Sequence, residues 1–442
     1  MFTVKDIKRI LLPLLLEQLL AVTVGMFDSV MVSSAGEAAV SGVSLVVPVN
    51  LLLNIVFTAL ATGGTVVCSQ LLGQKDYKTA KEAAKQLYYL TFLLSLLITF
   101  FALVFRKPLL SLFFGKVEAD VMACAESYFL ITALSYPFVA LSGSGAAIFR
   151  ATGNTGITLY IAIGTNFVNI IGNAVLIYGF RLGAIGAAIA TLVSVALGAV
   201  VNSLLCCSPK YSVYIEEPFR YSPNFSMIRK ILYIGVPSGV ENGMYQFGKL
   251  ITQSLVSSLG TAAIAANVAG QQLASLVDAL GHAVGLCVVT VVGRCIGAGE
   301  SKQAKKYAKT LLGTGYSVLT AMSVMLILFS KPLIDLYGLS TEASMLAHDL
   351  ILIYSAMTIV FWPLSFIMPY VFRAASDVRY TTAVSMLSMW LCRVALSYIF
   401  VLWLDLGLSG VWYAMFADWI VRTAFFTARF FSNKWLGKYK SD

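Results

Sequence analysis

Charged residues are scarce in this chain, and their scarcity excludes most soluble proteins. Only 12% of the 442 residues are Asp, Glu, Lys or Arg, whereas a soluble domain carries about 25%. The two histidines, His282 and His348, are too few for a histidine-based centre, so we predict no metal site and no cofactor. The seven cysteines are an odd number at no repeated spacing, which argues against a disulfide framework.

Long apolar runs take the place of charge: 59% of the residues are hydrophobic and the mean hydropathy is +0.83. About 20 apolar residues cross a bilayer as a helix, which satisfies the backbone hydrogen bonds in lipid. The sequence therefore predicts an all-α integral membrane protein without a cleaved signal peptide. About twelve such runs occur, near residues 10–33, 44–68, 87–106, 121–147, 157–179, 183–207, 230–258, 267–293, 308–329, 343–372, 379–403 and 407–431.

The net charge of +10 is explained by alternate connections between the runs, as the positive-inside rule predicts for cytoplasmic loops. An even number of spans places all these connections on one side. We therefore predict a multi-pass plasma-membrane protein with both termini in the cytoplasm and no nucleic-acid partner. The basic residues are Lys5, Lys8 and Arg9; Lys75, Lys78, Lys81 and Lys85; Lys210, Arg220, Arg229 and Lys230; Arg294, Lys302, Lys305, Lys306 and Lys309; and Lys434, Lys438 and Lys440.

The chain repeats itself at an offset of 224 residues (237 − 13). "LLPLLLEQLL" and "YIGVPSGVEN" each place a glutamate four residues after a proline, so Glu17 matches Glu241. "FRKPLLSLF" matches "FSKPLIDLY" at the same offset, and Arg150 of "FRATGNTGIT" matches Arg373 of "FRAASDVRYT" at 223. The matches predict two parallel six-helix lobes, residues 1–207 and 230–442, joined by a cytoplasmic linker, 208–229, with the substrate path between the lobes.

Acids and amides inside the first-half runs are candidates for ion binding, because a charge in the bilayer is costly. Asp28 lies eleven residues after Glu17, so both share one helix face, roughly 16 Å apart. Asn169 and Asn173 lie one turn apart on the fifth run, and Asn54 lies on the second. The alternative is that these side chains only join helices through hydrogen bonds.

The second half has its own line of polar residues. Glu241 lies on the seventh run, and Gln271, Asp278 and His282 share one face of the eighth. Asp278 and His282, one turn apart, could share a proton near neutral pH. Arg393 needs an acidic partner, for which Glu241 and Asp278 are the candidates. A buried ion-pair network that fixes helix packing is the alternative.

The two halves differ where such chemistry would lie: Asp28 falls on Thr252, Asn54 on Asp278, and Ile170 on Arg393. Aromatic residues offer a possible cargo surface by stacking or cation–π contact, and interface anchoring is the alternative. These aromatic candidates are Tyr136, Trp362 and Trp390.

Taken together, these segments resemble the MATE family of multidrug and toxic-compound exporters over nearly the whole chain. The resemblance rests on "MFDSVMVSSAGEAAVSGVS", "GGTVVCSQLLGQKDYKTAKE", "FRATGNT", "TNFVNIIGNAVLIYG" and "IGVPSGVENG". It implies a V-shaped pair of lobes that export organic, often cationic, compounds in exchange for H⁺ or Na⁺. It further implies that Asp28 binds the coupling cation together with Asn169 and Asn173. Some family members carry an acid where this chain has Tyr245.

The leading hypothesis is secondary active efflux by alternating access, with small organic molecules as substrates and a monomeric transporter in the bilayer. No G-x-x-x-x-G-K-[ST] motif is present, so ATP does not drive transport through this chain. A flippase of lipid-linked sugars would use the same architecture, but acids predominate among the intramembrane charges predicted here. An intramembrane enzyme is the distant alternative, with His282 and Asp278 as its only candidate pair and no matched nucleophile.

Overall fold

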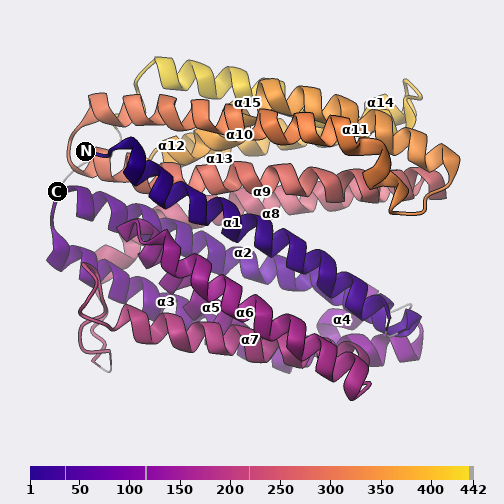
Figure 1. Ribbon diagram of the computed structural model, residues 1–442, viewed down its shortest axis with the longest axis horizontal. Helices are drawn as coiled ribbons and strands as arrows, with labels where there is room; N and C mark the ends of the chain where they lie inside the picture. The colour runs from indigo at the N-terminus through magenta and orange to yellow at the C-terminus, as the bar shows by residue number, and fades with distance from the viewer. Residues whose placement is uncertain (35, 115–116, 219, 438–442) are drawn as a thin grey trace. The chain divides into compact units, whose positions relative to one another are not determined.

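The computed structural model describes residues 1–34, 36–114, 117–218 and 220–437, and the regular structure in these ranges is helical (Figure 1). The chain divides into two compact units. The N-terminal unit comprises Lys8–Gly239, and the C-terminal unit comprises Val240–Asp442 together with Met1–Ile7. We describe each unit separately.

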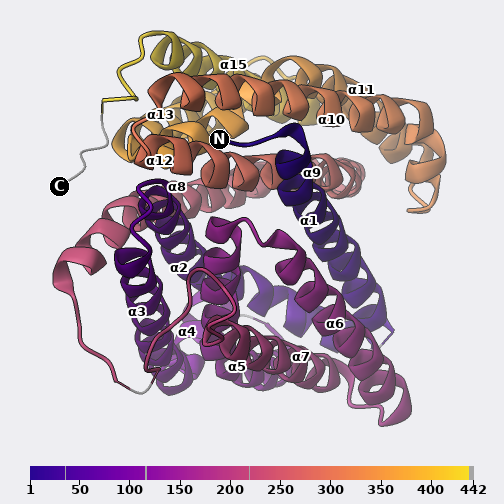
Figure 2. The ribbon, with the colours of Figure 1, turned by 60° about the vertical axis from the view of Figure 1, so that its left-hand side comes forward.

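The helices of the N-terminal unit follow the predicted apolar runs (Figure 2), and α5 packs against α2, α3 and α7. Gly63 lets α2 approach α8 closely, because a Cβ at this position would meet the backbone of Ile231 and Gly235. The elements are α1 (Val4–Ser33), α2 (Glu37–Gly73), α3 (Tyr77–Val104), α4 (Arg106–Phe114), α5 (Ala119–Thr152), α6 (Thr155–Asn173), the π-helix η1 (Ala174–Gly179), α7 (Gly183–Cys206) and the first part of α8 (Phe225–Ser257).

In the C-terminal unit, α9 is the most buried of the candidate membrane-spanning helices and packs against α10, α11 and α12. The first residues of the chain lie against α10, where the Phe2 backbone N–H donates to the Tyr307 hydroxyl at 2.9 Å. The elements after α8 are α9 (Thr261–Gly297), α10 (Ser301–Asp335), α11 (Thr341–Trp362), η2 (Pro363–Ile367), α12 (Met368–Ala374), α13 (Val378–Ser388), η3 (Met389–Ala395), α14 (Leu396–Leu402) and α15 (Gly407–Phe431).

Ten helical segments in the described ranges are long and apolar enough to cross a membrane. The other two predicted spans are α8, with 33 residues, and α15, with 25 residues. Both are long enough to cross the hydrocarbon core. Both are less apolar than the ten, and each carries charged residues within its length, among them Glu241 and Lys249 on α8 and Asp418 and Arg422 on α15. The protein is therefore a multi-pass α-helical membrane protein, as the sequence predicts.

The connection between α7 and α8 is held against α3 by polar contacts. Lys81 Nζ donates to Glu216 Oε1 at 2.6 Å, and Gln86 Nε2 donates to the Ser222 carbonyl at 2.7 Å. The hydrogen bond from Lys81 holds the pKa of Glu216 below its ordinary value. Lys305, the repeat-related lysine, binds the tail instead, donating to Asn433 Oδ1 at 2.8 Å.

Candidate ion and cargo sites

Each unit contains a glutamate–arginine ion pair between two different helices. In the N-terminal unit, Glu17 on α1 pairs with Arg150 on α5, and Thr158 Oγ1 donates to Glu17 Oε2 at 2.6 Å. In the C-terminal unit, Arg373 Nη2 on α12 lies 2.8 Å from Glu241 Oε2 on α8. These are the repeat-related residues. Glu17 and Glu241, expected among the ion- and cargo-binding residues, are thus each bound to an arginine.

The acid predicted to bind the coupling ion lies in a hydrogen-bonded chain across three helices. Asn173 Nδ2 donates to Asp28 Oδ1 at 2.8 Å and to Asn169 Oδ1 at 3.3 Å. Asn169 Nδ2 donates in turn to Thr191 Oγ1 on α7 at 3.3 Å. The structure therefore brings together the predicted trio. Thr191, which the sequence analysis does not single out, completes the chain.

The Asp28 network is rich in oxygen atoms, and not all of them accept a hydrogen bond from the described residues. Asn173 Oδ1 is buried and has no hydrogen-bond partner among the described residues, and Asp28 is only half-buried. A carboxylate beside an unsatisfied amide oxygen suits a hard cation, which prefers oxygen ligands. The π-helix η1 begins directly after Asn173, and π-helical turns occur frequently at functional sites.

Two further candidates lie apart from this chain of hydrogen bonds. Asn54 Oδ1 is buried without a hydrogen-bond partner in the described part of the chain. The Tyr136 hydroxyl donates to Asn50 Oδ1 at 2.6 Å, and its ring is buried in the core of the N-terminal unit beside Phe57. Tyr136 was expected either to contact cargo through its aromatic ring or to anchor the chain at the membrane interface, and the structure places it in the core of the N-terminal unit instead.

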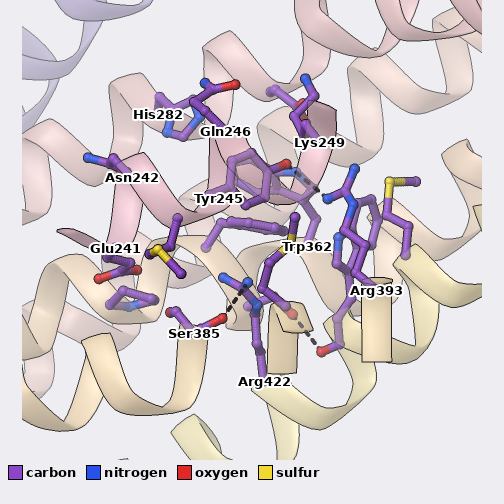
Figure 3. A pocket seen from close by; sticks show the side chains of 18 of the residues that line it. Glu241, Asn242, Tyr245, Gln246, Lys249, His282, Trp362, Ser385, Arg393 and Arg422 are labelled. Atoms are coloured by element: carbon purple, nitrogen blue, oxygen red, sulfur yellow. Dashed lines mark hydrogen bonds between the residues drawn. The ribbon is translucent and has the colours of Figure 1, made fainter. Parts of the chain in front are cut away.

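The polar residues predicted for the second half line one cavity of about 200 Å³ inside the C-terminal unit (Figure 3). Aromatic side chains from α11, η2 and α15 form much of its wall. The predicted residues among its lining are Glu241, Gln271, Asp278, His282 and Arg393. A second cavity of about 430 Å³ shares Gln246, Lys249, Gln271, Arg393, Trp412 and Met415 with the first. The two volumes together reach the range of roughly 300–1,000 Å³ found for small-molecule sites.

Asp278 and His282 do not share a proton directly in the described structure. The Tyr354 hydroxyl donates to Asp278 Oδ1 at 2.7 Å, and His282 Nδ1 lies 3.2 Å from the Tyr370 hydroxyl. Each member of the predicted pair is thus held by a tyrosine from another helix. Neither tyrosine was found from the sequence, because nothing in helical spacing relates residues so far apart in the chain.

The partner predicted for Arg393 is wrong. Arg393 Nη1 donates to the Tyr245 hydroxyl at 3.0 Å, and its guanidinium lies 5.1 Å from the centroid of the Tyr245 ring. Glu241 is occupied by Arg373 and lies on the other side of Tyr245 from Arg393 in Figure 3. Arg393 is carried by the π-helix η3, and the expectation of an acidic partner rested on the cost of a buried charge without a counter-charge.

The described residues contain no group of three His, Cys, Asp or Glu side chains that could hold a metal ion. What they contain is a set of membrane-spanning helices in two repeats, one with an acidic oxygen-rich network and the other with a polar aromatic cavity. These features define a membrane transporter built from an internal duplication.

Comparison with known proteins identifies the family. The family model MatE matches residues 13–175 and 237–399, so it matches the chain twice, at offsets of 237 − 13 = 224 and 399 − 175 = 224. The chain belongs to the MatE family, the multidrug and toxic-compound extrusion transporters. It is accordingly a transporter and not an enzyme.

Relatives and solved structures agree over nearly the full length. An uncharacterized transporter, YisQ, of Bacillus subtilis (strain 168) is 29% identical over 96% of this chain and 94% of its own. A probable multidrug resistance protein, NorM, of Thermotoga maritima is 25% identical over 98% and 93%. An outward-facing multidrug resistance MATE transporter shares the fold, with a TM-score of 0.91, 18% identity and coverage of 97% and 96%.

Proposed function

We propose that this protein is a secondary active exporter that expels organic compounds in exchange for H⁺ or Na⁺, with the coupling ion bound at Asp28. The observation that carries the proposal is the Asp28 network: a carboxylate inside a membrane span, bonded to Asn173, next to a buried amide oxygen without a partner among the described residues. Ionisable residues at such a depth are costly and mark ion pathways.

The state of the other acids in the N-terminal unit supports Asp28 as the ion site. The charge of Glu17 is already neutralised by Arg150, so its carboxylate is less available to an entering cation. Asp28 has an amide as its hydrogen-bond partner in place of an arginine. Binding of a proton or Na⁺ would neutralise this carboxylate, and the ion can drive transport only if it binds one conformation better than the other.

On the cargo side, Asp278 is the feature that favours a cationic group. It lines the cavity of the C-terminal unit and accepts a hydrogen bond from Tyr354, while the cavity's other carboxylate, Glu241, is paired with Arg373. Aromatic walls from Trp362 and Trp412 suit planar organic cations through cation–π contact. We further propose that the protein acts as a monomer in the plasma membrane, with both termini in the cytoplasm.

The test is transport of rhodamine 6G, an organic cation, in proteoliposomes of the full chain under separately imposed H⁺ and Na⁺ gradients. We expect one gradient to drive dye movement in the wild type. Asp28→Asn should lower the gradient-driven rate at least about tenfold, because the carboxylate that binds the ion is lost. Asp28→Glu, which keeps the charge, should retain part of it.

Asp120→Asn is the matched control, because it removes an exposed carboxylate at the start of α5 and should transport like the wild type. If Asp28→Asn moved the dye as fast as the wild type under both gradients, Asp28 would not be the coupling residue. If neither gradient drove transport in the wild type, the antiport mechanism itself would be wrong.

A further inference from the structure

Arg393 is a buried cation that has a neutral hydrogen-bond acceptor. Its side chain lines both cavities of the C-terminal unit, and the residue is only 5% exposed. The one side-chain hydrogen bond recorded for it in the described structure goes to the Tyr245 hydroxyl. A guanidinium carries five N–H donors in a fork that matches a carboxylate, and a buried charge without a counter-charge is costly.

A second cation lies beside it. Tyr245 and Lys249 are one turn apart on α8, so they share a face of that helix, and Figure 3 shows Lys249 on the Arg393 side of the pocket. Gly248 brings η3 close to α8, because a Cβ here would collide with the side chain of Met389. Lys249 and Arg393 both line the two cavities, so they stand where the cavities meet.

The carboxylates of this region are engaged elsewhere. Glu241 pairs with Arg373, and Asp418 pairs with Arg422 at 2.8 Å. Asp278 accepts a hydrogen bond from Tyr354 and is the one acid left among the residues that line the first cavity. Lys249 and Arg393 therefore exceed the remaining acid by one positive charge. The expectation that acids predominate among the intramembrane charges does not hold for this cavity.

The repeat places these charges at the counterpart of the Asp28 network. At the offset of 224 found at both ends of the family match, Asp28 corresponds to Thr252, Asn169 to Arg393 and Asn173 to Ser397. The sequence comparison had set Arg393 against Ile170, one residue away. Thr252 and Arg393 both line the second cavity. At corresponding positions, the N-terminal unit thus carries an acid and an amide, and the C-terminal unit carries a hydroxyl and an arginine.

We propose that Arg393 and Lys249 form an anion subsite in the cavity of the C-terminal unit, which binds a carboxylate group of the cargo. The carboxylate supplies the acceptor that Arg393 lacks, through charge-assisted hydrogen bonds that are stronger than neutral ones. The subsite deepens the proposed function by naming a chemical group of the substrate. It rests on the protein being an exporter of organic compounds and is independent of which ion drives export.

Equilibrium binding to the purified full chain in detergent, without any ion gradient, tests the subsite. The probes are three dyes on one xanthene core. Rhodamine 6G is a cation whose carboxyl is esterified, rhodamine 19 is its free acid and therefore a zwitterion, and fluorescein is an anion. We expect the wild type to bind rhodamine 19 at least about tenfold more tightly than rhodamine 6G. Comparing the affinity for fluorescein with that for rhodamine 19 shows whether the subsite takes its carboxylate from a purely anionic cargo or from a zwitterionic one.

The decisive quantity is the ratio of the two rhodamine affinities. Arg393→Gln should reduce this preference for the free acid at least about fivefold, and Arg393→Lys should keep part of it, because the charge is retained without the fork. Lys249→Gln should reduce the ratio by a smaller factor, and this half-buried residue provides the test if the Arg393 variants fail to fold. Lys331→Gln removes an exposed lysine of α10 and controls for general attraction of the dyes to a basic protein.

Equal binding of rhodamine 19 and rhodamine 6G by the wild type would overturn the subsite. So would a preference that Arg393→Gln and Lys249→Gln leave intact, or one that Lys331→Gln lowers just as much. These outcomes would leave the proposed ion coupling standing, because no gradient is present in the measurement. Conversely, a failure of all gradient-driven transport would refute the antiport mechanism and leave the binding ratio as the test of the subsite.

Discussion

Each repeat begins with a glutamate one turn after a helix proline, and in both units this glutamate pairs with the repeat-related arginine. Further along the same two helices the repeats differ: the N-terminal unit has Asp28, and the C-terminal unit has Thr252. The retained pair joins the first helix of each repeat to the end of the helix that carries the arginine, which is a structural role. The positions that differ lie in the Asp28 network and line the cavities. Agreement between the repeats therefore marks scaffold, and divergence marks chemistry.

The largest effect should come from breaking the retained pair. Glu241→Gln leaves Arg373 buried without its counter-charge, and loss of one partner of a buried pair costs about 3–5 kcal/mol. We expect a clearly lower thermal unfolding midpoint of the detergent-solubilised protein. Glu17→Gln should cost less, since the side chains of Glu17 and Arg150 are 12% and 18% exposed, against 9% and 8% for Glu241 and Arg373.

The exchanged variant Glu241→Arg with Arg373→Glu is the control for this prediction, because it restores opposite charges at the two positions. It should recover part of the lost stability. Single variants as stable as the wild type would show that the ion pair is not structural. The inference that agreement between the repeats marks structural residues would then be wrong.

A smaller but more specific effect should follow from moving the acid between the repeats. In the double variant Asp28→Asn with Thr252→Asp, the carboxylate stands at the corresponding position of the C-terminal unit. There it has Arg393 and Ser397 as counterparts in place of Asn169 and Asn173. We expect gradient-driven transport of rhodamine 6G to stay at least about tenfold below the wild type, since an arginine competes for the carboxylate that the ion must reach.

Thr252→Asp alone tests the anion subsite in the equilibrium-binding measurement with the rhodamine dyes. An introduced acid should occupy Arg393 and weaken the preference for rhodamine 19 over rhodamine 6G. Recovery of ion-coupled transport in the double variant would mean that the two repeats are interchangeable, against the divergence argued here.

Helix periodicity identifies part of this arrangement, since it places Asn169 and Asn173 one turn apart on one helix face. Their association with Asp28 was implied by the resemblance to the MATE family, and the structure joins the three residues by hydrogen bonds. Glu241, Asp278, His282 and Gln271 were expected on facing helices and do line one cavity. The number of spans and the internal repeat follow equally from hydropathy and self-comparison, because both depend on local sequence.

Helical periodicity does not predict which residues of distant helices contact one another. Arg150 and Glu17 are 133 residues apart, and nothing in either segment states that α5 ends beside α1. Arg393 was given the wrong partner because an acid seemed necessary, while an aromatic ring and a hydroxyl from Tyr245 occupy its side chain. Tyr354 and Tyr370 went unnoticed because tyrosines are common in membrane helices, both as interfacial anchors and in cores.

The smallest effect concerns the connectors, where the repeats also diverge: Lys81 binds Glu216 of the connection between α7 and α8, and Lys305 binds Asn433 of the tail. The hydrogen bond from Lys81 lowers the pKa of Glu216 from 4.5. A lowered pKa in the folded state means that this contact stabilises the fold above pH of about 4.5 and is lost as the pH falls further. The Lys305–Asn433 contact involves no carboxylate and should lack this acid dependence.

Thermal unfolding between pH 7 and pH 3 tests this difference. The unfolding midpoint should fall slightly less with acid in Glu216→Gln than in the wild type, and Asn433→Ala should show no such change. A steeper acid loss in Glu216→Gln would contradict the assignment, since removing the titrating group can only remove its share of the pH dependence.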